Sequence, residues 1–178
     1  VRSSWLIVLK IKEDDSLAWV KTTCWDDHIF IATKDWKAIQ FGEDDVRPMW
    51  RAASWVRWIK VKEDDEVVEV TIVSKDAKYV LVVTENGMWK ISDIEEYRDQ
   101  NRGWSWVKAM AVTAKTWKVI WAMTLSDEDR LTTDVLLMSK SGQTIRLPLK
   151  WIRVTSRVTQ WVILTKIRED DDIIVRAS

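Results

Sequence analysis

The sequence predicts an all-β protein built from propeller-like repeats of about 50 residues, and three observations lead to this prediction. Short β-branched runs recur along the chain, turn residues separate them, and a Trp-Val or Trp-Leu step returns at a nearly constant interval. The step lies at Trp5, Trp55, Trp106 and Trp161, with spacings of 50, 51 and 55 residues. About four short strands in a unit of this length are typical of a propeller blade.

The expected strands are runs rich in Val, Ile and Thr that are bounded by Asp, Asn, Gly or Lys. No helix of ordinary length is expected, and residues 93–97 have room for a single helical turn. In chain order, the expected strands are 7–11, 17–21, 29–33, 38–41, 56–61, 67–73, 79–84, 107–112, 119–124, 135–139, 145–147 and 162–167.

The repeat makes residues 1–178 a single repeat domain with three full units and a partial fourth. About three and a half blades are few for a closed ring, so we expect a fragment of a larger disc or an open arc. The units lie approximately at 5–54, 55–105, 106–160 and 161–178.

The composition is unusual in having 14 Trp and only 4 Gly, where average usage would give roughly 12 Gly. Aligning the hairpin turns 33–36, 84–87 and 139–142 places Trp36 where the other two turns have Gly87 and Gly142. Glycine is preferred in such turns because it adopts positive φ without steric cost. A tryptophan at this position would be strained.

We interpret most or all of these tryptophans as standing for glycines. One mechanism is the reading of UGA codons as Trp for a bacterium whose own code reads UGA as Gly. The alternative is that the tryptophans are genuine, and form an aromatic ring of blade contacts or stacking platforms for sugars or bases. The intact mass of protein purified from the native host distinguishes the two interpretations.

Several kinds of site are not expected. One cysteine, Cys24, excludes an intrachain disulfide, and one histidine, His28, makes metal and triad chemistry poor candidates. The Glu-Asp-Asp runs lack the alternating ligands of a calcium loop, and we find no nucleophile elbow and no paired carboxylates with a plausible pocket. No apolar run approaches the roughly 18 residues of a membrane span, and no signal-peptide pattern opens the chain. We therefore expect no catalytic residue, metal or cofactor in this segment.

The chain has 28 Lys and Arg and 28 Asp and Glu, but cations and acids occupy different parts of the repeat. The aligned segments 46–61, 97–112 and 152–167 contain ten cations and one acid, Asp99. Stacked blades would bring these cations into one basic band able to contact phosphates, unless they pair with nearby acids on a solvated face. The acidic runs, which we expect in hairpin turns, are 13–15, 26–27, 43–45, 63–66, 127–129 and 169–172. The candidate DNA-binding residues are Arg47, Arg51, Arg57, Lys60, Arg98, Arg102, Lys108, Arg153, Arg157 and Lys166.

With the suspect tryptophans read as glycines, the sequence resembles the C-terminal domains of the A subunits of bacterial DNA gyrase and of the related topoisomerase IV. The resemblance rests on residues 45–61, on 84–90 followed by 96–98, and on 152–154 leading to Arg157 and Trp161-Val162. It implies a β-pinwheel, which is a propeller variant with strands exchanged between neighbouring blades. It also implies a domain that binds and bends duplex DNA around a basic rim and presents a DNA segment for ATP-dependent supercoiling.

The resemblance further implies where chemistry and partners lie. The partners would be double-stranded DNA, the catalytic core of the A subunit, and the B subunit of gyrase, in the bacterial cytoplasm and on nucleoid DNA. Cleavage, ATP and Mg²⁺ would belong to other parts of the holoenzyme, since the catalytic tyrosine domain and the ATPase subunit have no counterpart in this chain.

One departure from the family pattern concerns the gyrase box, Gln-Arg-Arg-Gly-Gly-Lys-Gly, which supports tight DNA wrapping in that family. The nearest segment here lacks one arginine and the lysine even with its tryptophans read as glycines, and it lies in the middle of the chain. This degenerate segment is Gln100, Asn101, Arg102, Gly103, Trp104, Ser105 and Trp106.

Two other functions remain open from the sequence. A stand-alone propeller scaffold that binds proteins would show no salt-dependent retention on duplex DNA. A Trp-lined propeller that binds carbohydrate would need the tryptophans to be genuine and exposed.

Overall fold

The computed structural model describes residues 11, 16–49, 59, 61–97, 107–108, 118–157, 159, 162–163 and 173–177. For residues 107–108, 162–163 and 175–177 it describes the backbone alone. Most of the described chain is β-strand in three small antiparallel sheets, which confirms the all-β prediction. None of the helices in these ranges has the length and apolar character that crossing a membrane would require.

Three antiparallel hairpins form the framework of the sheets. Five of their six strands agree with the expected runs to within a residue or two, because each β-branched run pairs with the run that follows the next turn. The sixth strand, residues 88–93, was not among the expected strands, since it begins with Met88, Trp89 and Lys90 instead of β-branched residues. The hairpins are β1 (His28–Thr33) with β2 (Lys37–Gly42), β4 (Tyr79–Thr84) with β5 (Met88–Asp93), and β8 (Asp134–Ser139) with β9 (Thr144–Pro148).

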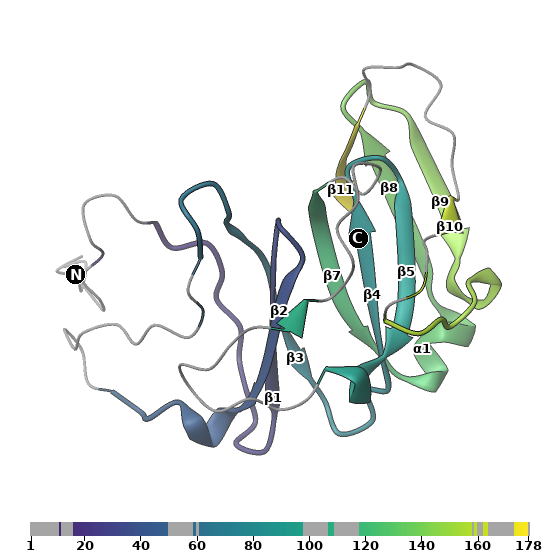
Figure 1. Ribbon diagram of the computed structural model, residues 1–178. Coiled ribbons are helices and arrows are strands. Elements are labelled where there is room, and N and C mark those ends of the chain that lie inside the picture. Colours follow the sequence, from purple (N-terminus) through teal and green to yellow (C-terminus); the bar gives the residue numbers. More distant parts are fainter. Residues whose placement is uncertain are drawn as a thin grey trace, which may run out of the picture.

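Strands from later in the chain complete each hairpin (Figure 1). The first sheet has the order β3-β1-β2-β6, the second β10-β5-β4-β7 and the third β11-β8-β9. β6 therefore pairs with β2 although β4 and β5 lie between them in sequence, which is the exchange of strands that the resemblance implies. The added strands are β3 (Val67–Val73), β6 (Val107–Lys108), β7 (Val119–Leu125), β10 (Val162–Ile163) and β11 (Ile174–Ala177).

The core lies between successive sheets and follows the two-residue alternation of β4. Val80 and Val82 belong to the cluster shared with the first sheet, where they meet Phe30. Leu81 and Val83 belong to the cluster shared with the third sheet. The second sheet is thus covered on both faces of β4, which explains why this strand is almost continuously apolar.

Backbone hydrogen bonds at the hairpin turns also join one sheet to the next. The amide of Val119, which begins β7, donates to the carbonyl of Lys34 in the first hairpin turn at 3.1 Å. The amide of Ile174, which begins β11, donates in the same way to Glu85 in the second hairpin turn at 2.7 Å. The same contact therefore occurs at the first and second hairpin turns and links each to the next sheet.

Some expected elements differ from the structure. Residues 17–21 form no strand; Leu17 and Val20 are exposed, and β-propensity without a partner strand forms no ladder. A short helix, α1 (Asp127–Thr132), stands where we expected an acidic turn, because Ser126 and Asp129 cap it reciprocally. The expected turn at 93–97 is confirmed as the 3₁₀ helix η2 (Ile94–Glu96). Most of each of the expected strands at 7–11, 56–61, 107–112 and 162–167 lies outside the described residues.

Two tryptophans have backbone conformations that favour glycine. Trp36 has φ of +66°, close to the +68° of Gly87 and the +86° of Gly142 at the equivalent turn positions, and Trp25 has φ of +58°. Within the described ranges these are the two non-glycine residues with positive φ. Such a conformation costs a bulky side chain roughly 1–2 kcal/mol. The backbone thus supports the glycine interpretation at both positions.

Candidate nucleic-acid interface

Each hairpin ends in a 3₁₀ turn, and an arginine follows each turn. The turns are η1 (Glu43–Asp45), η2 (Ile94–Glu96) and η3 (Leu149–Trp151). In each, the amide of the residue after the turn donates to the carbonyl of its first residue, at 2.8 to 3.0 Å. The next residues in sequence are Arg47, Arg98 and Arg153. Arg47 and Arg153 are exposed, and Arg98 lies outside the described residues.

A second backbone contact locks each 3₁₀ turn against the base of its hairpin. The first amide of the turn donates to the carbonyl of the residue that directly precedes the first strand of the hairpin. Glu43 donates to Asp27 at 2.9 Å, and Leu149 donates to Thr133 at 3.1 Å. Arg47 and Arg153 therefore leave the base of their hairpins. The opposite end, about 20 Å away for a six-residue strand, contains the hairpin turns.

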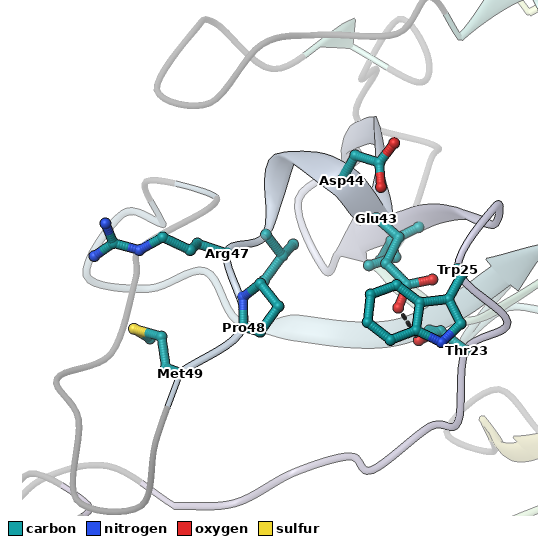
Figure 2. Close-up of a pocket in the computed structure, with 9 residues that line it drawn as sticks. Thr23, Trp25, Glu43, Asp44, Arg47, Pro48 and Met49 are labelled. Atoms are coloured by element: carbon teal, nitrogen blue, oxygen red, sulfur yellow. Dashed lines mark hydrogen bonds between the residues drawn. The ribbon is translucent and has the colours of Figure 1, made fainter.

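Arg47 lies at the edge of a surface cavity of about 520 Å³ (Figure 2). The guanidinium of Arg47 points away from Glu43 and Asp44, which also line the cavity. The hydroxyl of Thr23 donates to the Glu43 carboxylate, while Asp44 points in another direction. Two acids of one run thus line the wall of this cavity, because both belong to η1. They do not converge on a shared point.

Arg157 lies in a segment that runs along β5 toward β10. The amide of Thr155 donates to Ile91 at 2.9 Å, and Val154 makes a parallel bridge to the same residue. The amide of Arg157 donates to Oε2 of Glu96 at 2.7 Å. The side chain of Arg157 is half-buried, and its Nε has almost no solvent contact.

Lys90 is a buried cation beside this segment. Its ammonium donates to the carbonyl of Arg157 and, at 3.2 Å, to that of Thr159. Burial lowers the pKa of Lys90 to about 8; the Arg157 guanidinium acts in the same direction, and Glu96 opposes it. Burial also raises the pKa of nearby Tyr97 to about 12. The exchanged segment thus meets a dense group of charges on the second blade.

The structure describes only part of the predicted basic rim, so its role as an interface stays a prediction. It places Arg47, Arg153 and Arg157 on the segments that follow η1 and η3, and gives only the backbone of Lys108, in β6. The degenerate box-like segment, residues 100–106, lies outside the described residues. So do the rim residues Arg51, Arg57, Lys60, Arg98, Arg102 and Lys166.

The acidic runs are less separate from the arginines than we expected. Run 43–45 is a 3₁₀ turn next to Arg47, and run 127–129 is the first turn of α1; neither is a hairpin turn. Glu96 contacts the backbone of Arg157 because strand exchange returns this segment to the preceding blade. Run 63–66 does lie against a hairpin turn, where Asp65 binds Lys37.

The sequence did not single out Lys90, Glu96 or Asp65 as individual residues. Lys90 and Glu96 meet partners more than 60 residues away, which no local pattern reveals. In the described ranges, no group of three or more His, Cys, Asp or Glu residues is arranged to hold a metal ion.

Comparison with known protein families shows which family this chain belongs to. The model of the family described as "DNA gyrase C-terminal domain, beta-propeller" matches residues 27–74, 78–103 and 133–177. The chain belongs to this family. Its fold is accordingly the propeller variant that strand exchange indicates, and the resemblance seen in the sequence is confirmed.

Individual relatives agree with this assignment. The DNA gyrase A subunit of Kosmotoga olearia is 33% identical over 174 residues, covering 97% of this chain and 21% of the relative. The DNA gyrase A subunit of Chlamydia trachomatis is 35% identical over 175 residues, covering 97% of this chain and 20% of the relative. The chain thus spans about a fifth of the length of these curated relatives.

Solved structures show the same fold. A DNA gyrase A C-terminal domain superposes with a TM-score of 0.80 at 24% identity, covering 97% of this chain and 57% of that chain. The C-terminal domain of a DNA topoisomerase IV superposes with a TM-score of 0.83 at 18% identity, covering 96% of this chain and 52% of that chain. The gyrase and topoisomerase IV domains therefore share the fold of this chain.

Proposed function

We propose that this chain binds duplex DNA through the arginines that follow its 3₁₀ turns, and that it bends the DNA around the row of blades. The observation that carries the proposal is the repeated exit geometry of Arg47 and Arg153, which leave the base of two hairpins after equivalent closed turns. Family membership supports it, because the curated relatives are DNA gyrase A subunits.

The chemistry of such a surface suits the DNA backbone. Exposed guanidinium groups contact phosphates without reading bases, so affinity depends steeply on salt and weakly on sequence. DNA that bends easily would be favoured over stiff DNA. In this proposal the chain supplies no catalytic residue and needs no cofactor. It would serve a type II topoisomerase, most closely a gyrase, in the bacterial cytoplasm on nucleoid DNA, beside the B subunit of that enzyme and the catalytic core of its A subunit.

The test is the salt dependence of duplex binding by the double variant Arg47→Gln with Arg153→Gln. The slope of log K against log salt is negative, and each lost phosphate contact reduces its magnitude by about 0.9. The magnitude is therefore expected to decrease by about 2 in the double variant. The measurement is fluorescence anisotropy of a labelled duplex between low and moderate salt. Duplexes of different sequence should bind alike.

The matched control removes two exposed cations from the hairpin-turn end of the blades, as Lys62→Gln with Lys140→Gln. It has the same net charge as the test variant, and it should keep nearly the wild-type slope. Equal losses in both double variants would mean that only total charge matters. That result, or no binding of a long duplex at low salt, contradicts the proposal.

A further inference from the structure

Two side chains of the second blade hold the backbone of the segment that carries Arg153 and Arg157. Lys90, on β5, donates to the carbonyls of Arg157 and Thr159. Glu96, the last residue of η2, accepts from the amide of Arg157 at 2.7 Å and from the hydroxyl of Ser156 at 3.3 Å. A cation thus binds the carbonyls of residues 157 and 159, and an anion binds donors of residues 156 and 157.

This combination of a cation and an acid occurs in one of the three aligned hairpins. The hairpin alignment puts Ile39 and Ile145 at the position of Lys90, and Asp45 and Trp151 at the position of Glu96. Neither of the other two hairpins has a cation at the position of Lys90, so neither can place a cation and an acid as Lys90 and Glu96 are placed. The pair is therefore not a general requirement of the fold. Burying the Lys90 ammonium is costly unless hydrogen bonds offset the cost, and those bonds go to Arg157 and Thr159.

The position of Lys90 and Glu96 in the fold indicates what the pair does. The segment leaves η3 on the third blade and crosses to β10 on the second. Thr155 attaches it to Ile91, and beyond this point Lys90 and Glu96 make the side-chain contacts to its backbone. Arg153 and Arg157 lie on either side of the Thr155 attachment, so the direction of the chain at Arg157 depends on these two side chains.

We propose that Lys90 and Glu96 are positioning residues that hold this arginine-bearing segment in the conformation that binds DNA phosphates. The inference rests on the proposed DNA-binding function. Without the pair, the arginines keep their charge but must be ordered when DNA binds, and this ordering weakens affinity.

The direction of the change in DNA affinity distinguishes a positioning role of Glu96 from an effect of net charge. Glu96→Ala and Glu95→Ala each remove one negative charge from the same turn, and the side chain of Glu95 is exposed. If charge alone mattered, both variants would bind the polyanion more tightly. Positioning instead predicts that Glu96→Ala binds a duplex more weakly, by up to about tenfold, a change of about 1.4 kcal/mol. Glu95→Ala should bind as tightly as wild type or more tightly.

A conservative variant of Glu96 and a variant of Lys90 test the same contacts. Glu96→Gln keeps an oxygen that can accept from the amide of Arg157, so it should restore wild-type affinity. Lys90→Met removes the other half of the pair without leaving a buried charge, and should weaken binding as Glu96→Ala does. Hydrogen exchange of the full chain provides the readout without DNA: the amide of Arg157 should exchange faster in Glu96→Ala and not in Glu95→Ala.

The outcomes are distinguishable. If wild type shows no salt-dependent duplex binding, the proposed function fails and this inference fails with it. If wild type binds but Glu96→Ala binds equally or more tightly, the inference alone is overturned. An unchanged exchange rate at Arg157 in Glu96→Ala also overturns it, whatever the DNA result.

Discussion

Replacing Asp65 with alanine is expected to lower the free energy of unfolding by about 3–5 kcal/mol, because it breaks a buried ion pair. Oδ2 of Asp65 lies 2.7 Å from Nζ of Lys37, and neither side chain is more than 4% exposed. The same carboxylate accepts from Thr33 at 3.0 Å and from the amide of Asp35 at 2.9 Å. The variant removes these three contacts between the Asp65 carboxylate and the first hairpin, and leaves Lys37 buried without this partner.

Urea denaturation measures the loss, and the neighbouring acid provides the control. Asp64 belongs to the same acidic run but is exposed, so Asp64→Ala should change stability by less than about 0.5 kcal/mol. Asp65→Asn keeps an acceptor and should fall between the two. Similar losses in Asp64→Ala and Asp65→Ala would contradict the structural role of Asp65.

The effect of Asp65 should also depend on pH. Burial acts to raise the pKa of Asp65, but the bonds from Lys37, Asp35 and Thr33 outweigh it and hold the pKa below its ordinary value of 3.8. A carboxyl with a lowered pKa contributes stability that is complete above the ordinary pKa and is lost as pH falls through the folded value. The gap between wild type and Asp65→Ala should therefore be full at pH 7 and shrink below about pH 4.

Protein purified from the native host is expected to have an intact mass well below the 21.0 kDa that this sequence gives. The reason is that glycine should occupy most or all of the 14 tryptophan positions. The backbone supports this at Trp25 and Trp36, whose φ values of +58° and +66° are those of turn glycines. Intact mass spectrometry decides the question, and a mass that matches 14 tryptophans would refute the glycine interpretation.

The recombinant chain offers a matched pair of variants for the same interpretation. Trp25 and Trp151 are similarly exposed, at 76% and 72%, but only Trp25 has positive φ. Trp25→Gly should raise stability by about 0.5–1 kcal/mol, since it relieves about 1–2 kcal/mol of strain and costs about 0.5–1 in backbone entropy. Trp151→Gly has no strain to relieve and should give no gain. A gain in both variants would show that backbone strain is not the cause.

Most hairpin strands were predictable because each depends on its own composition and on the turn beside it; β5 was not, since it begins with Met88, Trp89 and Lys90. Runs 67–73 and 79–84 coincide with β3 and β4, since β-branched residues between polar turns have one favourable arrangement. The run at 17–21 is also mainly apolar, but it has only one β-branched residue, Val20, and forms no strand. Local pattern does not reveal whether a partner strand is available, and the expected runs also missed β5 and β11.

The sequence was enough to predict that the arginines of the candidate site occupy equivalent positions in each repeat, but not to predict the contacts that surround them. The spacing of Arg47, Arg98 and Arg153 reveals equivalent positions, and the structure adds the closed 3₁₀ turn that precedes them. Nothing local separates Asp65 from Asp64, or marks Lys90 and Glu96 as partners of a segment that strand exchange brings back. These contacts depend on tertiary structure, so the sequence alone could not predict them.

The most direct test of the central proposal measures whether the chain bends DNA. A duplex much shorter than the persistence length of about 150 bp is stiff, so its labelled ends come closer only if protein bends it. Energy transfer between the two ends should rise as the chain binds, and should fall back at high salt and in the Arg47→Gln, Arg153→Gln double variant. Saturated binding with no rise in energy transfer would contradict the proposal.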